Sequence, residues 1–382
     1  MERSQQLAKR FEEKFKSIPQ LFKSPGRINL IGEHTDYNEG FVLPAAVDKY
    51  IHVAVSKRAD TEIHLHSVEY NEDHVCSIAD LSSPGKQWPL YILGVVAQLK
   101  KINLPITGFN LMIDGDVPIG AGMSSSAAVE CATIFALNEI FSLNISKVEM
   151  VKMAQLAEHE YAGVKCGIMD QFASMFGKEN SVIQLDCRSL DYKLVPFNMS
   201  GIKIVLLDTN VKHSLASSAY NERRQQCETG VATVKKQFPT VNSLRDISLD
   251  MLNENIKDPI VYNRCKYVVE EIERLQSACI DLEKNDLSAF GQKMFATHDG
   301  LSKLYEVSCV ELDCLVDAVR DNKAVYGARM MGGGFGGCTI NIVKESEVEN
   351  VISVATKSYK EKLNKDLKAY VVSIVDGTSA SN

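Results

Sequence analysis

The 382-residue sequence contains no long apolar run, no basic block and no closely spaced cysteine pair. A bilayer-spanning helix needs ~20 consecutive apolar residues. No stretch approaches that length, so we expect no membrane segment. The first residues, MERSQQLAKRFEEKF, also lack the apolar core of a signal peptide. Leu7, Phe11 and Phe15 recur every four residues there and instead predict an amphipathic helix.

The ten cysteines form no C-x-x-C pair, and the nearest two, Cys309 and Cys314, are five positions apart. This spacing favours buried, reduced thiols in a cytoplasmic protein over disulfides or a zinc site. The 42 Lys and Arg residues face 49 Asp and Glu residues, for a net charge of −7. With no basic block, we expect no nucleic-acid or membrane partner. The acidic surface and the lack of long apolar stretches favour a monomer.

The composition, 45% hydrophobic and 24% charged, is that of a globular protein, and the length indicates two domains. We place them at residues 1–195 and 196–382. The apolar periodicity predicts helices at residues 88–101, 146–162, 214–238, 258–280, 284–302, 308–322 and 346–363, and one after residue 124. It predicts a segment at residues 21–36 that starts as a strand and becomes a polar loop, and strands near residues 50–57, 61–68, 108–114, 181–186, 202–208, 325–330, 338–343 and 368–375. Helices layered on mostly antiparallel sheets make the expected fold class α+β.

A glycine-rich turn, PIGAGMSSSAA at residues 118–128, runs directly into an apolar helix. Glycines let the backbone approach a ligand, and the helix start adds unpaired amides and a positive dipole. We expect Ser124 to cap this helix and the neighbouring hydroxyls to bind phosphate oxygens or a magnesium ion. The segment matches neither a Walker A loop nor a Rossmann fingerprint. The alternative is an ordinary capped turn.

Two further segments carry unusual chemistry. Residues 332–337, GGGFGG, place five glycines in six positions before an apolar strand. So many glycines are entropically unfavourable on folding, which favours a loop that closely approaches a ligand, with a flexible hinge as the alternative. Residues 24–37, SPGRINLIGEHTDY, gather groups able to hydrogen-bond several hydroxyls, as sugar recognition requires. Solvated loop charges are the alternative there.

The joint occurrence of these segments indicates a family. GRINLIGEHTDYNEG is similar to the galactokinase signature. PIGAGMSSSAA and MGGGFGGCTINIV resemble the phosphate loop and the third motif of the GHMP small-molecule kinases. The motifs occur in the family order, and the resemblance spans nearly the whole chain. Ile28 and Met123 depart from the usual Val and Leu but keep apolar bulk.

The resemblance implies an ATP-dependent sugar 1-kinase with its active site between two GHMP domains. It would transfer the γ-phosphoryl group of ATP to the anomeric hydroxyl of α-D-galactose, in galactose catabolism. The family motif CGIMDQ makes Asp170 the implied general base, with Arg27 beside it to stabilise charge. For Asp170 alone, a helix N-cap is the alternative. The implied sugar-binding residues are Glu33, His34, Thr35, Asp36, Gly167, Asp170 and Tyr220, and the alternative for Tyr220 is a half-buried helix aromatic.

On the nucleotide side, the resemblance implies a second set of contacts. The implied nucleotide-binding residues are Ser67, Gly120, Ala121, Gly122, Met123, Ser124, Ser125 and Ser126. Ser126 and Glu158 match the family's magnesium ligands, so Mg²⁺ is the expected cofactor. Trp88 either lies near the adenine or is a core tryptophan.

Three other functions remain open from the sequence. A related GHMP kinase would act on N-acetylgalactosamine or L-arabinose. A non-catalytic galactose and ATP sensor would lack part of the serine–alanine run, which is complete here at residues 124–128. A plain α/β binding module would leave Arg27, Asp170, Ser126 and Glu158 as coincidence.

Overall fold

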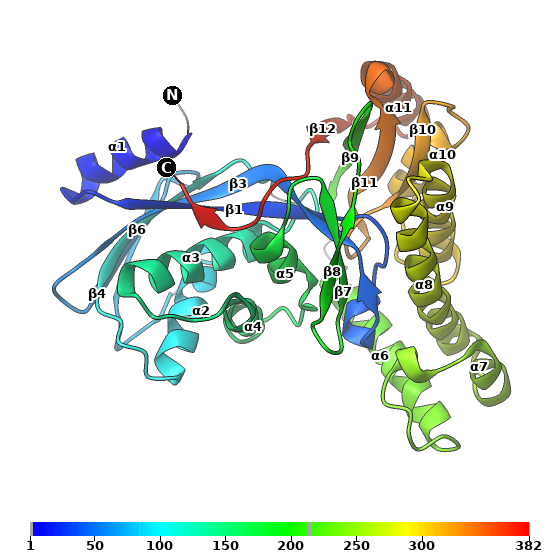
Figure 1. Cartoon of the computed structure of the whole chain (residues 1–382), viewed down its shortest axis with the longest axis horizontal. Coiled ribbons are helices and arrows are strands. Elements are labelled where there is room, and N and C mark those ends of the chain that lie inside the picture. The colour runs from blue at the N-terminus through cyan, green and yellow to red at the C-terminus, as the bar shows by residue number, and fades with distance from the viewer. Residues whose placement is uncertain (1–2, 84, 119, 213–215, 382) are drawn as a thin grey trace.

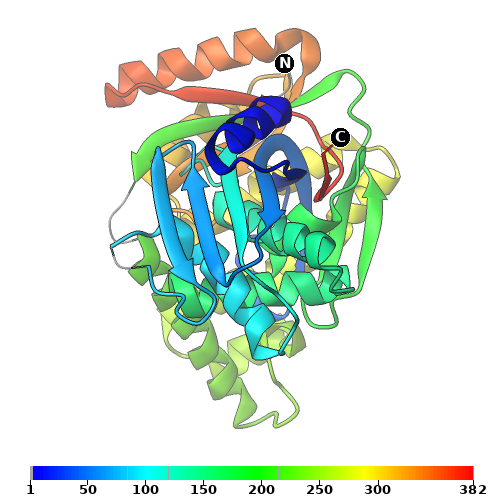
Figure 2. The ribbon, with the colours of Figure 1, turned by 90° about the vertical axis from the view of Figure 1, so that its left-hand side faces the viewer.

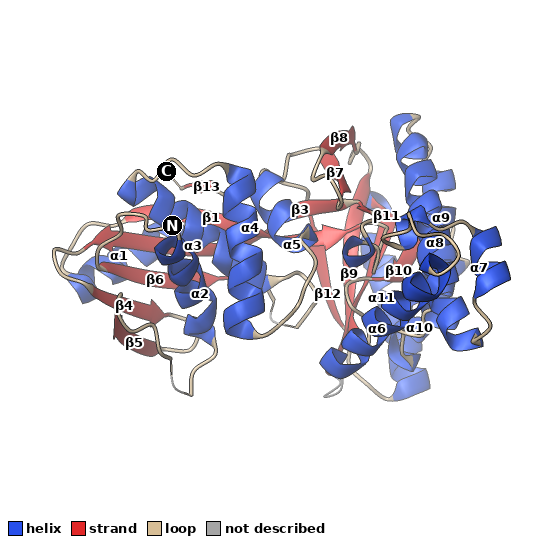
Figure 3. Ribbon diagram, turned by 90° about the horizontal axis from the view of Figure 1, so that it is seen from below, coloured by secondary structure: helices blue, strands red, loops and turns tan. Residues whose placement is uncertain are grey.

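A computed structural model describes residues 3–83, 85–118, 120–212 and 216–381. The molecule has two halves arranged along its long axis, each built around a β-sheet (Figures 1 and 3). Both ends of the chain lie on the N-terminal half (Figures 1 and 2). The α+β class predicted from the sequence is confirmed.

The N-terminal sheet has six strands in the order β13-β1-β3-β6-β4-β5. All neighbours are antiparallel except β4 and β6. Its strands are β1 (Gln20–Asn29), β3 (Pro44–Lys57), β4 (Glu62–Ser67), β5 (Glu72–Ser77), β6 (Phe109–Gly115) and β13 (Ser379–Ala380). The four predicted strands of this region are confirmed. The prediction missed β5 because this polar edge strand, EDHVCS, has no apolar face.

Four helices cover one face of this sheet, and α1 (Arg3–Phe15) lies on the other (Figure 1). They are α2 (Trp88–Lys101), α3 (Ser125–Phe141), α4 (Lys147–Ala157) and α5 (Met169–Phe176). Leu7 and Phe11 bury the predicted apolar stripe of α1 against Ala54 and Met112. A Ser146–Glu149 capping box starts α4, which continues into the π-helical turn η2 (Glu158–Ala162). Such turns occur frequently at functional sites.

The C-terminal sheet has four antiparallel strands in the order β10-β11-β9-β12. They are β9 (Ile202–Lys212), β10 (Val325–Met330), β11 (Gly336–Lys344) and β12 (Lys368–Val372). The helices are α6 (Ala216–Lys235), α7 (Leu249–Asn255), α8 (Pro259–Glu283), α9 (Leu287–Lys303), α10 (Val310–Arg320) and α11 (Val348–Leu363). All but the short α7 were predicted. The predicted start of α6 at residue 214 lies outside the described residues.

A small third sheet lies where the halves meet: β2 (Phe41–Val42), β7 (Ser181–Asp186) and β8 (Tyr192–Pro196). Short 3₁₀ turns complete the chain at η1 (Asp36–Asn38), η3 (Leu244–Asp246) and η4 (Glu345–Glu347). The division at residues 195 and 196 stays a prediction, and the last strand crosses it, because Ala380 of β13 pairs with Phe22 of β1. The ten cysteines are free thiols, as predicted. Within the described chain, no helix is both long and apolar enough to cross a membrane.

Candidate active site

A cavity of about 610 Å³ lies between the two halves and draws its walls from both. The N-terminal half supplies the 27–36 loop, η2 and the start of α5, while the C-terminal half supplies α6 and the glycine-rich segment. Sequence-predicted residues on this cavity are Arg27, Glu33, His34, Asp36, Glu158, Gly167, Asp170 and Tyr220, with the glycine-rich residues 332–335. Thr35 is not among the lining residues. Its buried hydroxyl lies 2.9 Å from the Gly32 carbonyl and thus helps hold the loop.

A two-pronged ion pair joins Arg27 to Asp170. Arg27 Nε donates to Asp170 Oδ1 at 2.8 Å, and Nη2 donates to Oδ2 at 2.7 Å. Arg27 Nη1 also donates to the Gly122 carbonyl. This bond connects the pair to the glycine-rich turn within residues 118–128, the predicted phosphate loop. Helix α5 has Ile168 at its N-cap, and Asp170 lies in its first turn, so the N-cap alternative for Asp170 is excluded. Such paired guanidinium and carboxylate groups are held in a fixed relative orientation.

The prediction that the Ser124 side chain caps the following helix is wrong. Ser124 occupies the N-cap position of α3, but with left-handed backbone angles (φ 55°, ψ 60°) and no side-chain capping bond. Its hydroxyl instead donates to Asp170 Oδ2 at 2.5 Å. A hydrogen bond from this hydroxyl to a charged carboxylate is stronger than a capping hydrogen bond between the hydroxyl and a neutral backbone amide. Ser124 therefore joins the phosphate loop to the candidate base.

Asp36 presents a carboxylate whose charge is destabilised. Burial raises its pKa to about 6, and the nearby charges of Asp170 and Glu33 add to this, while a 2.9 Å hydrogen bond from the Tyr37 amide opposes it. The carboxylate packs directly against the Gly167 backbone. The two predicted sugar-binding positions therefore form one surface.

His34 is held as a neutral imidazole. Its Nε2 lies 3.2 Å from the Gly333 carbonyl, and its Nδ1 lies 2.7 Å from the Tyr37 hydroxyl. A carbonyl only accepts, so Nε2 carries the proton and Nδ1 accepts from Tyr37. Burial lowers the pKa of His34 to about 4. Both ring nitrogens thus have partners, and a contact between this ring and a sugar hydroxyl stays a prediction.

Two smaller cavities flank the phosphate loop. One, of about 370 Å³, is lined by Gly120, Gly122, Ser124 and the glycine-rich residues 331–337. The other, of about 430 Å³, brings together Ser67, Trp88, Ser125 and Ser126. The side chains of Ala121 and Met123 are fully buried, and the Met123 carbonyl accepts the Arg27 amide at 3.0 Å. Ala121 and Met123 therefore contribute backbone and packing to this region.

Glu158 and Ser126, the two predicted magnesium ligands, are in contact with each other. The Ser126 hydroxyl hydrogen-bonds Glu158, whose pKa is raised by burial and by the charge of Asp170. Burial and Glu158 also raise the pKa of Glu130, whose Oε1 has no hydrogen-bond partner among the residues that the structure describes. Crowded carboxylates, an unpaired oxygen and a hydroxyl form a donor set that suits Mg²⁺. Glu160, two positions away, pairs with Lys101, and Glu158 as a magnesium ligand stays a prediction.

Sequence reasoning missed several residues of this region. Gln171 Nε2 donates to Glu130 Oε2 at 3.0 Å and to Glu158 Oε2 at 2.8 Å, bridging the two acids. The Tyr305 hydroxyl lies 2.8 Å from that of Tyr37 and continues the hydrogen-bond chain behind His34. Glu130 could have been identified from the sequence, because it is the only acidic residue in the apolar stretch AAVECATIF and acidic side chains are seldom buried unless they are paired. Tyr305 carried none, since its partner lies 268 positions away.

The fold and the three clustered motifs define a kinase of the GHMP class. The family model described as "GHMP kinases N terminal domain" matches residues 91–178, and the family model described as "GHMP kinases C terminal" matches residues 275–361. The narrower description "Galactokinase galactose-binding signature" matches residues 9–57. A mevalonate kinase structure, 19% identical with a TM-score of 0.67 over 93% of this chain and 99% of its own, shares the fold.

Closer relatives narrow the class. A galactokinase of Clostridium acetobutylicum is 41% identical over 97% of this chain and 98% of its own. A galactokinase of Clostridium beijerinckii is 42% identical over 95% of both chains. The crystal structure of Lactococcus lactis galactokinase complexed with galactose matches with a TM-score of 0.95 and 33% identity over 99% of both chains. The chain belongs to the galactokinase family.

Proposed function

We propose that the cavity between the halves is where this protein transfers the γ-phosphoryl group of ATP to the anomeric hydroxyl of α-D-galactose, giving galactose 1-phosphate and ADP. The Arg27–Asp170 pair carries the proposal. It lies on the sugar-loop cavity and is bonded through Gly122 and Ser124 to the phosphate loop. A carboxylate in that position faces both reactants, as direct phosphoryl transfer requires.

Asp170 accepts or orients the anomeric hydroxyl proton in this proposal, and Arg27 stabilises charge on the transferring group. Two donors, Arg27 and Ser124, fix the carboxylate before any substrate arrives. Such preorganisation lowers the reorganisation needed during the reaction. Direct in-line transfer requires no covalent enzyme intermediate.

Galactose is held by the 33–36 loop and the facing segments. Glu33 and Asp36 offer carboxylate oxygens, Gly167 offers close backbone, and the half-buried side chain of Tyr220 closes the side formed by α6. Galactose differs from other aldohexoses only in how its hydroxyls point. Fixed acceptors on several sides therefore provide the discrimination.

Gly120, Gly122 and the α3 N-terminus receive the ATP phosphates in this proposal, with Ser67 and Trp88 on the far side of the loop. Ser126 and Glu158 would hold Mg²⁺. Such a cation neutralises the phosphate oxygens and compensates the mutual repulsion of Glu130, Glu158 and Asp170.

The testing experiment is a sugar panel with ATP and Mg²⁺, read by coupled ADP release and by the position of the phosphate in the product. We expect phosphorylation of galactose at C1, with N-acetylgalactosamine and L-arabinose at least about tenfold poorer in kcat/KM. A preference for either of those sugars would replace the galactose assignment. Galactose binding without ADP release would indicate the sensor.

A further inference from the structure

We propose that Arg329 is a positioning residue for the proposed sugar-binding cavity between the halves. Arg329 holds the Glu33 carboxylate and thereby fixes the loop at residues 33–36, the sugar loop, against the glycine-rich segment. This inference rests on the proposed function and extends it to Arg329, a residue that the sequence analysis did not predict as part of the site. Arg329 is the second-last residue of β10 in the C-terminal half, three positions before the glycine-rich segment at residues 332–337. Its side chain is the largest in the described chain to be buried below 2% exposure.

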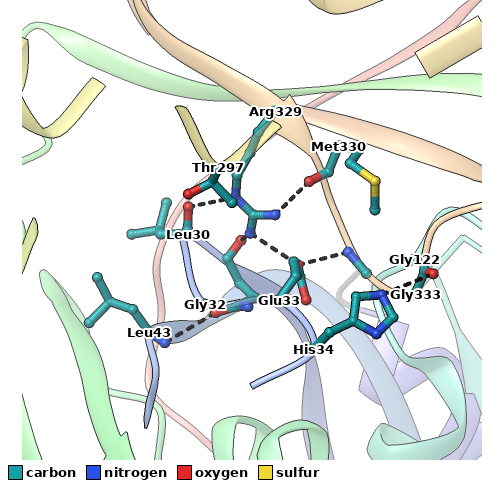
Figure 4. A network of polar contacts seen from close by, with 12 residues as sticks. Leu30, Gly32, Glu33, His34, Leu43, Gly122, Thr297, Arg329, Met330 and Gly333 are labelled. Carbon is teal, nitrogen blue, oxygen red and sulfur yellow. Dashed lines mark hydrogen bonds and ion pairs between the residues drawn. The ribbon is translucent and has the colours of Figure 1, made fainter. Parts of the chain in front are cut away.

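The guanidinium reaches across the boundary between the halves (Figure 4). Nε donates to the Leu30 carbonyl at 2.8 Å, and Nη2 donates to Glu33 Oε1 at 3.0 Å and to the Asn29 carbonyl. These partners are 296 to 300 positions away in the chain. Nη1 donates to the Met330 carbonyl of its own strand. One side chain therefore holds the end of β1, the start of the sugar loop and the end of β10 together.

Glu33 connects Arg329 to the glycine-rich segment by hydrogen bonds to both. The oxygen that accepts from Arg329, Oε1, also accepts the Gly332 amide at 2.8 Å. One position later, the Gly333 carbonyl accepts from His34. The sugar loop and the glycine-rich segment are thus joined by two adjacent hydrogen bonds, and both line the same cavity (Figure 4).

Each of the two neighbouring buried acids has its own arginine partner, and Arg329 is the partner of Glu33. Within the described residues, the one ion pair of Glu33 is with Arg329, and the Glu33 side chain is 3% exposed. The neighbouring buried acid, Glu271, has its own cation in Arg274 and accepts the Gly32 amide at 2.9 Å. Removal of Arg329 would leave the buried Glu33 carboxylate without its ion-pair partner, with Arg27 as a more distant positive charge. Such a group takes up a proton or moves toward water.

The first test is the variant Arg329→Met, which keeps much of the side-chain volume and removes the charge. We expect KM for galactose to rise about 30-fold or more, as for loss of one partner of a buried charged pair, with KM for ATP changed less than threefold. A residue that only stabilises the fold would leave the ratio of the two KM values unchanged.

A double-mutant cycle with Glu33→Gln tests whether Arg329 acts through Glu33. A neutral amide needs no counter-charge, so adding Arg329→Met to Glu33→Gln is expected to change KM for galactose less than about fivefold further. Additive effects would overturn the inference. The control is Arg245→Met, because Arg245 also joins the halves, through Asp186 and the Glu39 carbonyl, without contact to Glu33. We expect it to lower stability and leave the ratio of the two KM values unchanged.

Should Arg329→Met yield no folded protein by circular dichroism, Arg329→Lys replaces it. Lysine keeps the charge but not the planar donors, so the same selective rise in KM for galactose is expected, about fivefold. Equal changes in both KM values, in either variant, would contradict the positioning role. Failure of the proposed function is separable, because the wild-type protein would then phosphorylate no galactose in the same assay.

Discussion

The backbone of Gly167 lies so close to Asp36 that a Cβ atom at position 167 would fall 1.7 Å from Asp36 Oδ2. No side chain larger than hydrogen fits there unless the carboxylate moves. Asp36 belongs to the sugar loop and Gly167 to the segment leading into α5, so this contact sets the distance between two walls of the cavity.

Gly167→Ala is therefore expected to displace Asp36 and to raise KM for galactose at least about tenfold, with KM for ATP nearly unchanged. Steady-state kinetics with each substrate varied checks this. Gly163→Ala is the control on the same loop. A Cβ there meets nothing within 4 Å, although φ is +74°, so it adds backbone strain of about 1 kcal/mol without the clash. Equal effects of the two variants would refute the role of the contact.

Asp170→Asn is expected to lower kcat about 10²- to 10⁴-fold, because the amide cannot take the hydroxyl proton. ATP binding should survive, since the phosphate loop keeps its own backbone contacts. Single-turnover assays and calorimetric titration with ATP separate the two effects. A near-normal kcat would exclude the base role.

Glu158→Gln is expected to raise the Mg²⁺ concentration needed for half-maximal activity about tenfold or more. The amide removes one anionic oxygen from the candidate site. Glu160→Gln is the matched control two positions away, because Glu160 pairs with Lys101 on the surface. Magnesium titration of both variants at saturating ATP and galactose is the measurement. The metal assignment fails if both curves match the wild type.

The pH dependence should report Asp36. Its pKa is raised to about 6, so the carboxylate is ionised at pH 7 and is protonated as the pH falls through 6. A protonated carboxyl loses acceptor capacity for sugar hydroxyls, so kcat/KM for galactose should fall about tenfold between pH 7 and 5. Asp36→Asn should lack this limb while having a lower plateau. An unchanged limb in that variant would assign the titration to another group.

The sequence by itself determined the class of fold and the family, and it predicted where the chemistry takes place. Apolar periodicity and the Ser146–Glu149 capping box are local signals, so most helices and strands were predicted close to their observed bounds. Arg27 lies within the 24–37 segment, whereas Asp170 and Glu158 lie outside the three motifs and were implied by the family resemblance. The polar edge strand β5 and the short α7 escaped because neither has a clear apolar face.

Only the tertiary structure decided which partners these residues have. The Ser124 hydroxyl binds Asp170 rather than its own helix, and Arg329 reaches Glu33 across 296 positions. A sequence pattern shows which face a residue occupies, but hydrogen-bond partners depend on how distant segments pack. Burial then makes those partners matter, since a charge removed from water must be paired within the protein.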